Sequence, residues 1–362
     1  MNAIHFGSRR RNGARQAQLF LLGLGAIGCA SAAVAAPAGA ATSEGGARAK
    51  IVPIVFYSSI GYDKAVAAAF TKKYHIPVEI EHNATGVALA QIEASRDNPK
   101  WSMWWTDGPT NFTLLDRQHL LLHDIVPKVR WTTLGQQAVP RDGSYVPTGL
   151  TIAAALVYNK HNVSHPPKTW LDLLEPQWKH TVGMNDPSIS GPTYPFVAGM
   201  MSSLGGINPG KAFFLALKSD GLVINQKNGP TLSALADGQI NIALVQSTAA
   251  VSAELSDPNF AVEYPDPATL LPSAIGIDAK APTMVQQECE KFVRFVLSRA
   301  GQHAMQTGDP TGDSLYYPIL QDVRPLAALP PLAHVRTQAI NPVSWGKRQA
   351  AIDAWFTANI VQ

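Results

Sequence analysis

The sequence predicts an α/β protein built as two lobes, and three observations lead to this class. Short apolar runs rich in β-formers alternate with helical patterns, and a polar loop joins most of these runs to the next helix. One apolar run, residues 150–158, has no turn inside it and predicts a strand that passes from one lobe to the other. The chain has 362 residues, which is long enough for two lobes that each bury a core, and its 46% hydrophobic and 15% charged residues suit a compact protein.

The N-terminal residues 1–35 are predicted to be an export signal. Four arginines at positions 9–15 precede an apolar run over 19–30, and small residues at 33–35 fit a signal-peptidase cut. Ser8-Arg9-Arg10 leaves twin-arginine export open, and Cys29 leaves lipid attachment open. Residues 36–49 are expected to form a linker, and the mature protein is expected in the periplasm.

Charge and cysteine content exclude two classes of protein. The export signal holds four of the 29 basic residues and none of the 26 acidic ones, so the mature chain has a net charge of −1. No basic and aromatic cluster stands out, so nucleic acid is not an expected partner. Cys289 is the single cysteine left after cleavage, which excludes an internal disulfide, and its place on the apolar face of a predicted helix favours a packing role.

The first part of the mature chain predicts one sheet. The pattern alternates between expected strands at 51–57, 77–81 and 102–105 and expected helices at 62–74, 87–96 and 111–118. Strands that alternate with helices favour a parallel sheet, and ligands bind beyond the carboxyl ends of such strands. Polar side chains fall at that edge, namely Ser58, Ser59, Thr85 and Thr106.

The second part of the chain predicts another sheet and a return to the first. Further strands are expected at 181–184, 222–225, 241–245, 260–264 and 273–277, the last of which rejoins the first sheet. Helices are expected at 170–174, 209–219, 284–297 and 345–360, and after the polar loops at 226–231 and 246–248. The predicted domains are therefore lobe 1 from 50–149 and 265–362, which includes the C-terminal helices, and lobe 2 from 150–264.

The segment TVGMNDPSISGPTYPF, residues 181–196, is the stretch around which we expect the second lobe to be organised. It predicts a buried strand, a polar turn and a helix start that carries hydroxyls at Ser188, Ser190 and Thr193. The unpaired N–H groups at a helix start attract anions. Each hydroxyl has the alternative role of an ordinary helix cap.

Motifs spread along the chain resemble the bacterial extracellular solute-binding proteins that serve ABC importers, in the branch that holds ferric-iron, sugar-phosphate and phosphonate binders. The matching segments are VFYSS, WTDGPTNF, GLTIAAALVYNK, PPKTWLDLLEPQWK, MNDPSISGPTYPF, ADGQINIALVQ and FVRFVLSRAGQ. The resemblance implies a two-lobed periplasmic-binding-protein-like fold with a crossover-strand hinge that closes on its ligand. It also implies a membrane permease as partner, no cofactor and no catalysis, and we expect a monomer.

We expect the ligand to be small and anionic, with a phosphate or phosphonate group. Hydroxyls, amides and helix starts donate hydrogen bonds to such a group. The candidate ligand-binding residues are Ser58, Ser59, Thr85, Thr106, Asp107, Ser188, Ser190, Thr193, Asn228, Ser247 and Thr248. Asp107 is the acidic exception; we expect it either to pair with an ammonium group, as in 2-aminoethylphosphonate, or to stabilise a turn before Gly108.

Other ligands and functions remain open at this level. In the resembling ferric-iron binders, adjacent tyrosines hold the metal in a loop that matches Gln246-Ser247-Thr248-Ala249, and the tyrosines are missing here. Polyamines and thiamine are further alternatives, although a single cleft acid is few for a multiply charged amine. A secreted enzyme is disfavoured because no G-x-S-x-G, H-E-x-x-H or zinc spacing occurs, whereas a sensor for a membrane receptor would look the same.

Overall fold

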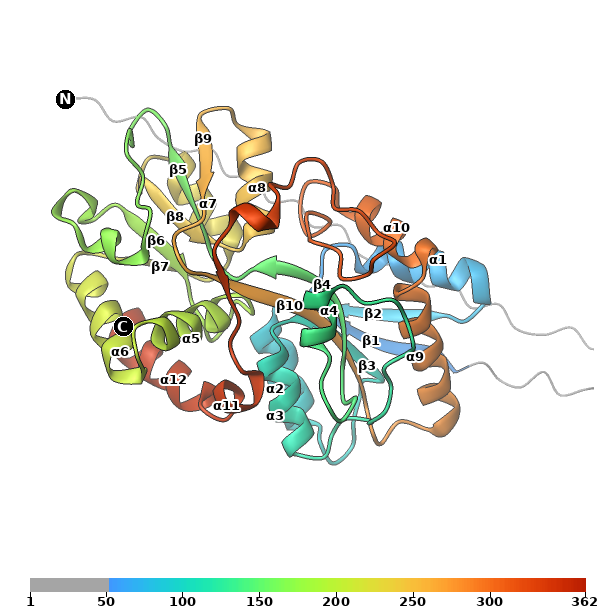
Figure 1. The fold of residues 1–362 in the computed structure, drawn as a ribbon. Coiled ribbons are helices and arrows are strands. Elements are labelled where there is room, and N and C mark those ends of the chain that lie inside the picture. Colours follow the sequence, from blue (N-terminus) through green and yellow to red (C-terminus); the bar gives the residue numbers. More distant parts are fainter. Residues whose placement is uncertain (1–51) are drawn as a thin grey trace, which may run out of the picture. The chain divides into compact units, whose positions relative to one another are not determined.

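The computed structural model describes residues 52–362 and arranges them in two lobes, each built around one sheet (Figure 1). The predicted export signal, Cys29 and the linker 36–49 lie outside the described residues. No helix within residues 52–362 has the length and apolar character needed to cross a membrane.

The sheet of lobe 1 is mixed. Its strand order is β11 (Thr337–Gln338), β10 (Ala268–Ile277), β3 (Met103–Asp107), β1 (Ile54–Ser58) and β2 (Val78–His82), and β4 (Val146–Ile152) also pairs with β10. Strand β1 runs parallel to β2 and β3, whereas β10 runs antiparallel to β3 and β4. The carboxyl ends of β1, β2 and β3 therefore share one edge, as the sequence predicted.

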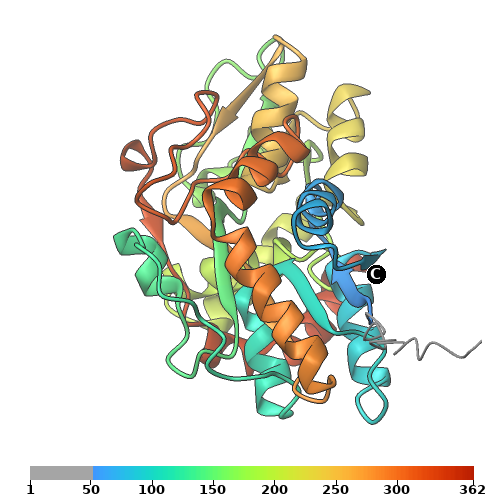
Figure 2. The same ribbon diagram turned by 90° about the vertical axis from the view of Figure 1, so that its right-hand side faces the viewer.

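Helices cover both faces of this sheet. Helices α1 (Asp63–Tyr74), α9 (Thr283–Val296) and α10 (Arg299–Gly308) pack with Phe56 and Trp105 on one face, and Figure 2 shows α9 and α10 in orange on that side. Helices α2 (Thr85–Ala94) and α3 (Pro109–Arg117) pack with Tyr57 and Trp104 on the other. Because neighbouring strand residues point to opposite faces, the aromatic residues of β1 and β3 divide between two cores.

Lobe 2 repeats this arrangement on a second sheet. Its strand order is β7 (Val223–Asn225), β6 (Val182–Asn185), β8 (Ile242–Val245), β5 (Ala155–Asn159) and β9 (Phe260–Glu263), with β6 parallel to β7 and β8. Helices α5 (Thr193–Ser203) and α6 (Ile207–Ser219) contribute to one core cluster, and α7 (Asn228–Ala236) and α8 (Ser247–Ser256) contribute to another. This sheet is therefore also buried on both faces.

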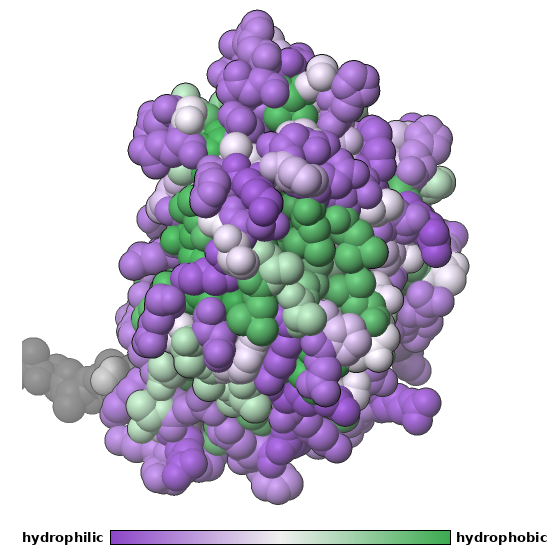
Figure 3. All heavy atoms as spheres, turned by 90° about the vertical axis from the view of Figure 1, so that its left-hand side faces the viewer, coloured by the Kyte–Doolittle hydropathy of each residue, from purple (hydrophilic) through white to green (hydrophobic). Residues whose placement is uncertain are grey.

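Lobe 2 also keeps apolar side chains at its surface. Figure 3 shows hydrophobic residues gathered in the middle of the face that lies on the left in Figure 1, with hydrophilic residues around them. Leu171 and Leu215 of this lobe are 54% and 45% exposed.

The lobes are connected by strands that leave one sheet and enter the other. The chain crosses from β4 to β5 at Ala153 and Ala154, and it returns from β9 to β10. The sequence predicted one unbroken strand over 150–158, whereas the structure has two strands with a bend between them. The bend is needed because β4 pairs in the first sheet and β5 in the second.

The C-terminal segment makes a third connection. Helix α11 (Pro342–Gly346) packs on α3 of lobe 1, where a Cβ at Gly346 would lie only 2.2 Å from Thr113 Oγ1. Helix α12 (Gln349–Phe356) continues into a π-helical turn (Thr357–Val361), and Phe356 lies in a core cluster with lobe 2 residues such as Phe214. This packing differs from the predicted assignment of all of 265–362 to lobe 1.

Two helices were not predicted, α4 (Thr133–Ala138) and α10, and the helix predicted at 170–174 is a 3₁₀ turn. The helix predicted at 345–360 is divided into α11 and α12, and the other expected strands and helices are present, with ends shifted by a few residues. Cys289 is fully buried in the lobe 1 core, in agreement with a packing role.

Candidate functional site

The N-terminus of α8 in lobe 2 contacts two carboxylates of lobe 1. Gln246 donates from Nε2 to Asp107 Oδ2 over 2.8 Å, and Thr248 donates from Oγ1 to Asp313 Oδ1 over 3.2 Å. Asp107 ends β3, while Asp313 lies in the turn after α10 and also accepts the Gly61 N–H over 2.7 Å. These bonds mark the boundary at which the lobes meet.

Asp107 is buried and Asp313 is half-buried at this boundary. Burial raises the pKa of Asp107, the charge of Asp313 raises it further, and the hydrogen bond from Gln246 opposes the shift. Burial likewise raises the pKa of Asp313. Since ionising both groups is costly at short range, the pair retains protons at a higher pH than free aspartates do.

A second contact between the lobes lies at the start of α2. Thr85 and Thr106 share a hydrogen bond of 2.8 Å between their hydroxyl oxygens, and Gly86 donates its N–H to the Ile189 carbonyl over 3.4 Å. A Cβ at Gly191 would lie 2.3 Å from Thr85 Oγ1, so this loop of lobe 2 rests directly on α2. The structure therefore has the lobes in direct contact at α2 as well as at α8.

Several of the predicted hydroxyls have hydrogen-bond partners within the protein. Ser58 Oγ accepts the Ile60 N–H over 3.2 Å, and Ser247 Oγ accepts the Ile152 N–H over 2.9 Å, which fastens α8 to strand β4. Ser188 is exposed and donates to Asp186 Oδ1 over 2.7 Å. These three hydroxyls are therefore paired within the protein, and none of them is the N-cap of α1, α5 or α8.

The amide of Asn185 connects three polar residues at the carboxyl end of β6. Its Nδ2 lies 2.6 Å from Asn228 Oδ1 and 3.4 Å from Ser190 Oγ, and its Oδ1 accepts the Thr231 hydroxyl over 2.6 Å. Thr193 is buried as the first residue of α5. The starts of α5 and α7 are therefore held in place by one buried amide.

Ser59 differs from the other hydroxyls. Its Oγ is buried and has no hydrogen-bond partner within residues 52–362. Buried hydroxyls are usually paired, so an unpaired one at the edge of β1 is available to a ligand.

Three aromatic side chains and one histidine near the predicted site are held within the protein. Trp104 and Trp105 are both fully buried in lobe 1, so neither lines the cleft, because both faces of β3 are covered. The Tyr194 hydroxyl donates to the Trp345 carbonyl over 2.6 Å and is likewise engaged. His82 Nδ1 lies 2.7 Å from Asp63 Oδ2 of the same lobe.

Sequence reasoning missed Asp313 and the role of Gln246. Asp313 belongs to the segment GDPTGDS at 308–314, which resembles an ordinary turn and reaches the boundary only because α10 packs on α1. Gln246 directly follows a buried strand, and a polar residue at that position lies at the sheet edge where ligands bind. Its position in the sequence could therefore have identified it as a candidate.

Two α/β lobes that meet across hinge strands, with polar helix starts at the boundary, define a ligand-capturing binding protein. The chain belongs to the bacterial extracellular solute-binding proteins, because the model of that family matches residues 65–333. The resemblance inferred from the sequence motifs is therefore confirmed, as is the two-lobed fold.

Solved structures of similar fold support this class. Iron-bound HitA from Pseudomonas aeruginosa has a TM-score of 0.70 and 20% identity over 84% of this chain and 98% of its own. AfuA from Actinobacillus pleuropneumoniae, with fructose-6-phosphate bound, has a TM-score of 0.72 and 18% identity over 85% and 98%. A periplasmic thiamin binding protein has a TM-score of 0.67 and 19% identity over 85% and 96%.

Proposed function

We propose that this protein is the periplasmic solute-binding component of an ABC importer, and that its solute carries both an ammonium group and a compact anionic group. An aminoalkylphosphonate such as 2-aminoethylphosphonate has this chemistry. The observation that carries the proposal is the pair Asp107 and Asp313, which meets the N-terminus of α8 at the boundary between the lobes.

The two carboxylates favour an ammonium group. Within residues 52–362 neither Asp107 nor Asp313 forms a salt bridge. A buried carboxylate without a cationic partner is costly, and an ammonium group bound between two of them would relieve this cost. A solute that is only an anion would instead meet two groups of like charge, so a purely anionic ligand fits less well than the sequence predicted.

Helix starts and hydroxyls favour an anionic group on the same solute. The first turn of α8 presents the N–H groups of Ser247 and Thr248, which have no partner inside the helix because of their position. The unpaired Oγ of Ser59 adds a donor on the lobe 1 side. A phosphonate at this place would accept charge-assisted hydrogen bonds, which are about twice as strong as neutral ones.

Capture works by hinge closure. With the lobes apart, Gln246 and Thr248 move away from Asp107 and Asp313, and the solute gains access to all four side chains. A solute that contacts both lobes stabilises the closed form by the difference between its affinities for the closed and open forms. The membrane permease then recognises the closed form.

A cationic solute such as a polyamine or thiamine is the second candidate, because Asp313 gives the boundary the second acid that the sequence lacked. Ferric iron is disfavoured, since Gln246, Ser247 and Thr248 stand where the resembling iron binders have tyrosines. Solved structures of this fold hold iron and fructose-6-phosphate, so the fold itself does not choose between these solutes.

A thermal-shift screen tests the proposal. The panel contains 2-aminoethylphosphonate, ethylphosphonate, ethanolamine, phosphate, spermidine, thiamine and ferric citrate. We expect 2-aminoethylphosphonate to raise the melting temperature by about 5 °C or more at a hundredfold excess over Kd, and to exceed ethylphosphonate and ethanolamine. If spermidine or thiamine gives the largest shift, the second candidate replaces the first; if ferric citrate does, both are wrong.

A further inference from the structure

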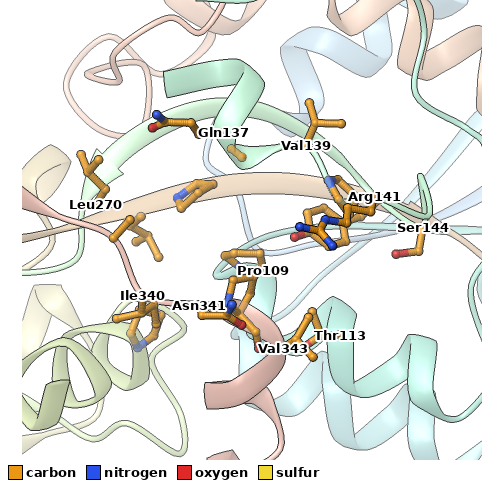
Figure 4. A pocket seen from close by; sticks show the side chains of 18 of the residues that line it. Pro109, Thr113, Gln137, Val139, Arg141, Ser144, Leu270, Ile340, Asn341 and Val343 are labelled. Carbon is orange, nitrogen blue, oxygen red and sulfur yellow. Dashed lines mark hydrogen bonds between the residues drawn. The ribbon is translucent and has the colours of Figure 1, made fainter. Parts of the chain in front are cut away.

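A pocket of about 570 Å³ lies on the hinge, outside the boundary formed by Asp107, Asp313 and α8. Its walls come from α3, the segment 134–145, strands β4 and β10, Pro195 of α5, and residues 339–343, which include the start of α11. Figure 4 shows side chains from these separate parts of the chain arranged around it, with Arg141 among them. Both lobes, the hinge strands and the C-terminal segment therefore contribute to one cavity.

The lining has the character of a small-molecule site. Leu134, Val139, Leu270, Ile340 and Val343 supply apolar surface. Pockets that bind small organic molecules measure about 300–1,000 Å³ and combine such walls with a few polar groups.

The polar groups of the pocket favour an anion. Its two acids are engaged, because Asp116 lies 2.6 Å from His123 Nε2 and Asp142 accepts the Ser144 hydroxyl over 2.7 Å. Its two guanidinium groups, Arg117 and Arg141, have no hydrogen-bond or ion-pair partner in the described part of the chain. Guanidinium groups bind carboxylates through paired hydrogen bonds.

Tyr145 adds a further donor. Its side chain lines the pocket, and the residue is 2% exposed. An occupant that accepts a hydrogen bond would satisfy this group.

The pocket and the lobe boundary share one short segment of backbone. Asp107 faces Gln246 of lobe 2, while Pro109, two residues later, lines the pocket. Between them, Gly108 has a φ of 89° and donates its N–H to the carbonyl of the pocket residue Pro272 over 3.0 Å. A Cβ on Gly108 would lie 3.3 Å from Pro195 of lobe 2, so movement between the lobes changes the wall of the pocket.

We propose that this pocket is a second ligand site, which binds a small molecule with an apolar body and a carboxylate and which is coupled to hinge closure. Apolar walls hold the body of the ligand, Arg141 and Arg117 bind its carboxylate, and Tyr145 donates to it. Because walls from both lobes form the pocket, occupancy favours the hinge angle at which they fit the ligand. Coupling of this kind is reciprocal, so closure of the lobes changes affinity at the hinge pocket by the same factor.

Octanoate, with octanamide as its uncharged counterpart, provides the probe. Titration calorimetry is expected to give saturable binding of octanoate to the wild-type protein and binding of octanamide at least tenfold weaker. R141Q removes a charged partner and should weaken octanoate at least tenfold, while V139W fills the cavity and should abolish binding. R299Q is the matched control, since Arg299 is an exposed arginine on α10 away from the pocket, and it should bind octanoate as the wild type does.

Three results would overturn this site: no binding of octanoate to the wild-type protein, equal affinity for octanamide, or unchanged affinity in both R141Q and V139W. The coupling has its own measurement, the distance between spin labels placed on the two lobes. Saturating octanoate should shift that distance distribution in the wild type and leave it unchanged in V139W. An identical distribution with and without octanoate in the wild type would overturn the coupling.

Discussion

Replacing Gly86 by alanine should prevent the lobes from closing while leaving each lobe folded. Gly86 is the second residue of α2, and its N–H lies against the Ile189 carbonyl of lobe 2. An added Cβ would lie 2.1 Å from the Ser188 carbonyl oxygen, which belongs to the backbone and has no freedom to turn aside. Carbon and carbonyl oxygen approach to about 3.3 Å, so the lobes must separate there by about 1 Å.

The cost of this change falls on the closed form alone. Inserting a methyl group into a packed contact costs about 1–3 kcal/mol, which shifts the closed-to-open ratio by roughly 5- to 150-fold. Solute affinity should fall by up to the same factor, since only the closed form holds the solute with both lobes. Alanine in place of glycine within a helix favours folding by up to about 1 kcal/mol, so resistance to denaturant should be unchanged or higher.

G229A provides the control, because Gly229 is the second residue of α7 and nothing lies within 4 Å of its added Cβ. Spin labels on K72C in α1 and L255C in α8, both exposed, report the distance between lobes. We expect G86A to lengthen this distance and G229A to keep the wild-type value. If G86A keeps the wild-type distance and affinity, the lobes do not close through this contact.

Three further predictions concern pH and the C-terminal helix. Affinity for 2-aminoethylphosphonate should rise between pH 6 and 8, with proton release on binding. Burial raises the pKa values of Asp107 and Asp313, the charge of Asp313 raises that of Asp107 further, and the ammonium group requires the ionised carboxylates. Calorimetry in buffers of different ionisation enthalpy measures this, and a falling affinity would contradict it. Burial raises the pKa of Asp353 to about 8, and the charge of Asp186 adds to this shift. Protonated Asp353 therefore contributes fully to the stability of the folded state below the unfolded pKa of about 3.9. This contribution is lost as the pH rises through 8. Between pH 4 and 8, the free energy of unfolding of D353N should therefore increase relative to that of the wild type by up to about 1.4 kcal/mol per pH unit. Denaturant titrations measure this difference, and a difference that does not change with pH would refute the raised pKa of Asp353. F356A should lower the free energy of unfolding by about 3–5 kcal/mol, because Phe356 is fully buried and its ring centre lies 5.3 Å from that of Phe214. L215A at the surface should lower it by less than about 1 kcal/mol. Equal effects would contradict the packing of α12 on lobe 2.

Local sequence patterns were sufficient for the strands and for the helices that follow them. Strand β8 and the start of α8, for example, were predicted because a buried apolar run ends abruptly at Gln246 and Ser247. Such signals depend on neighbouring residues, and the order of strands and helices then limits the possible sheets. The two-lobed fold could accordingly be predicted from the amino-acid sequence.

What the sequence lacked was the partner of each polar group. A hydroxyl at a helix start looks the same whether it caps a turn, as Ser188 does with Asp186, or remains unpaired, as Ser59 does. Asp313 lies more than 200 residues from Asp107 along the chain, and only the packing of α10 on α1 brings it to the lobe boundary. Charge balance at a site formed by distant segments follows from tertiary packing, and the sequence alone therefore identified only one of the two acids at this boundary.

In the proposed function, Asp107 and Asp313 recognise the ammonium group of the solute at the boundary between the lobes. Calorimetric affinities of the wild-type protein and D107N for 2-aminoethylphosphonate and for ethylphosphonate, which lacks the amine, measure this recognition directly. We predict that the wild type prefers the amino compound at least tenfold and that D107N loses most of this preference. Equal affinities in the wild type, or a preference that survives in D107N, would contradict it.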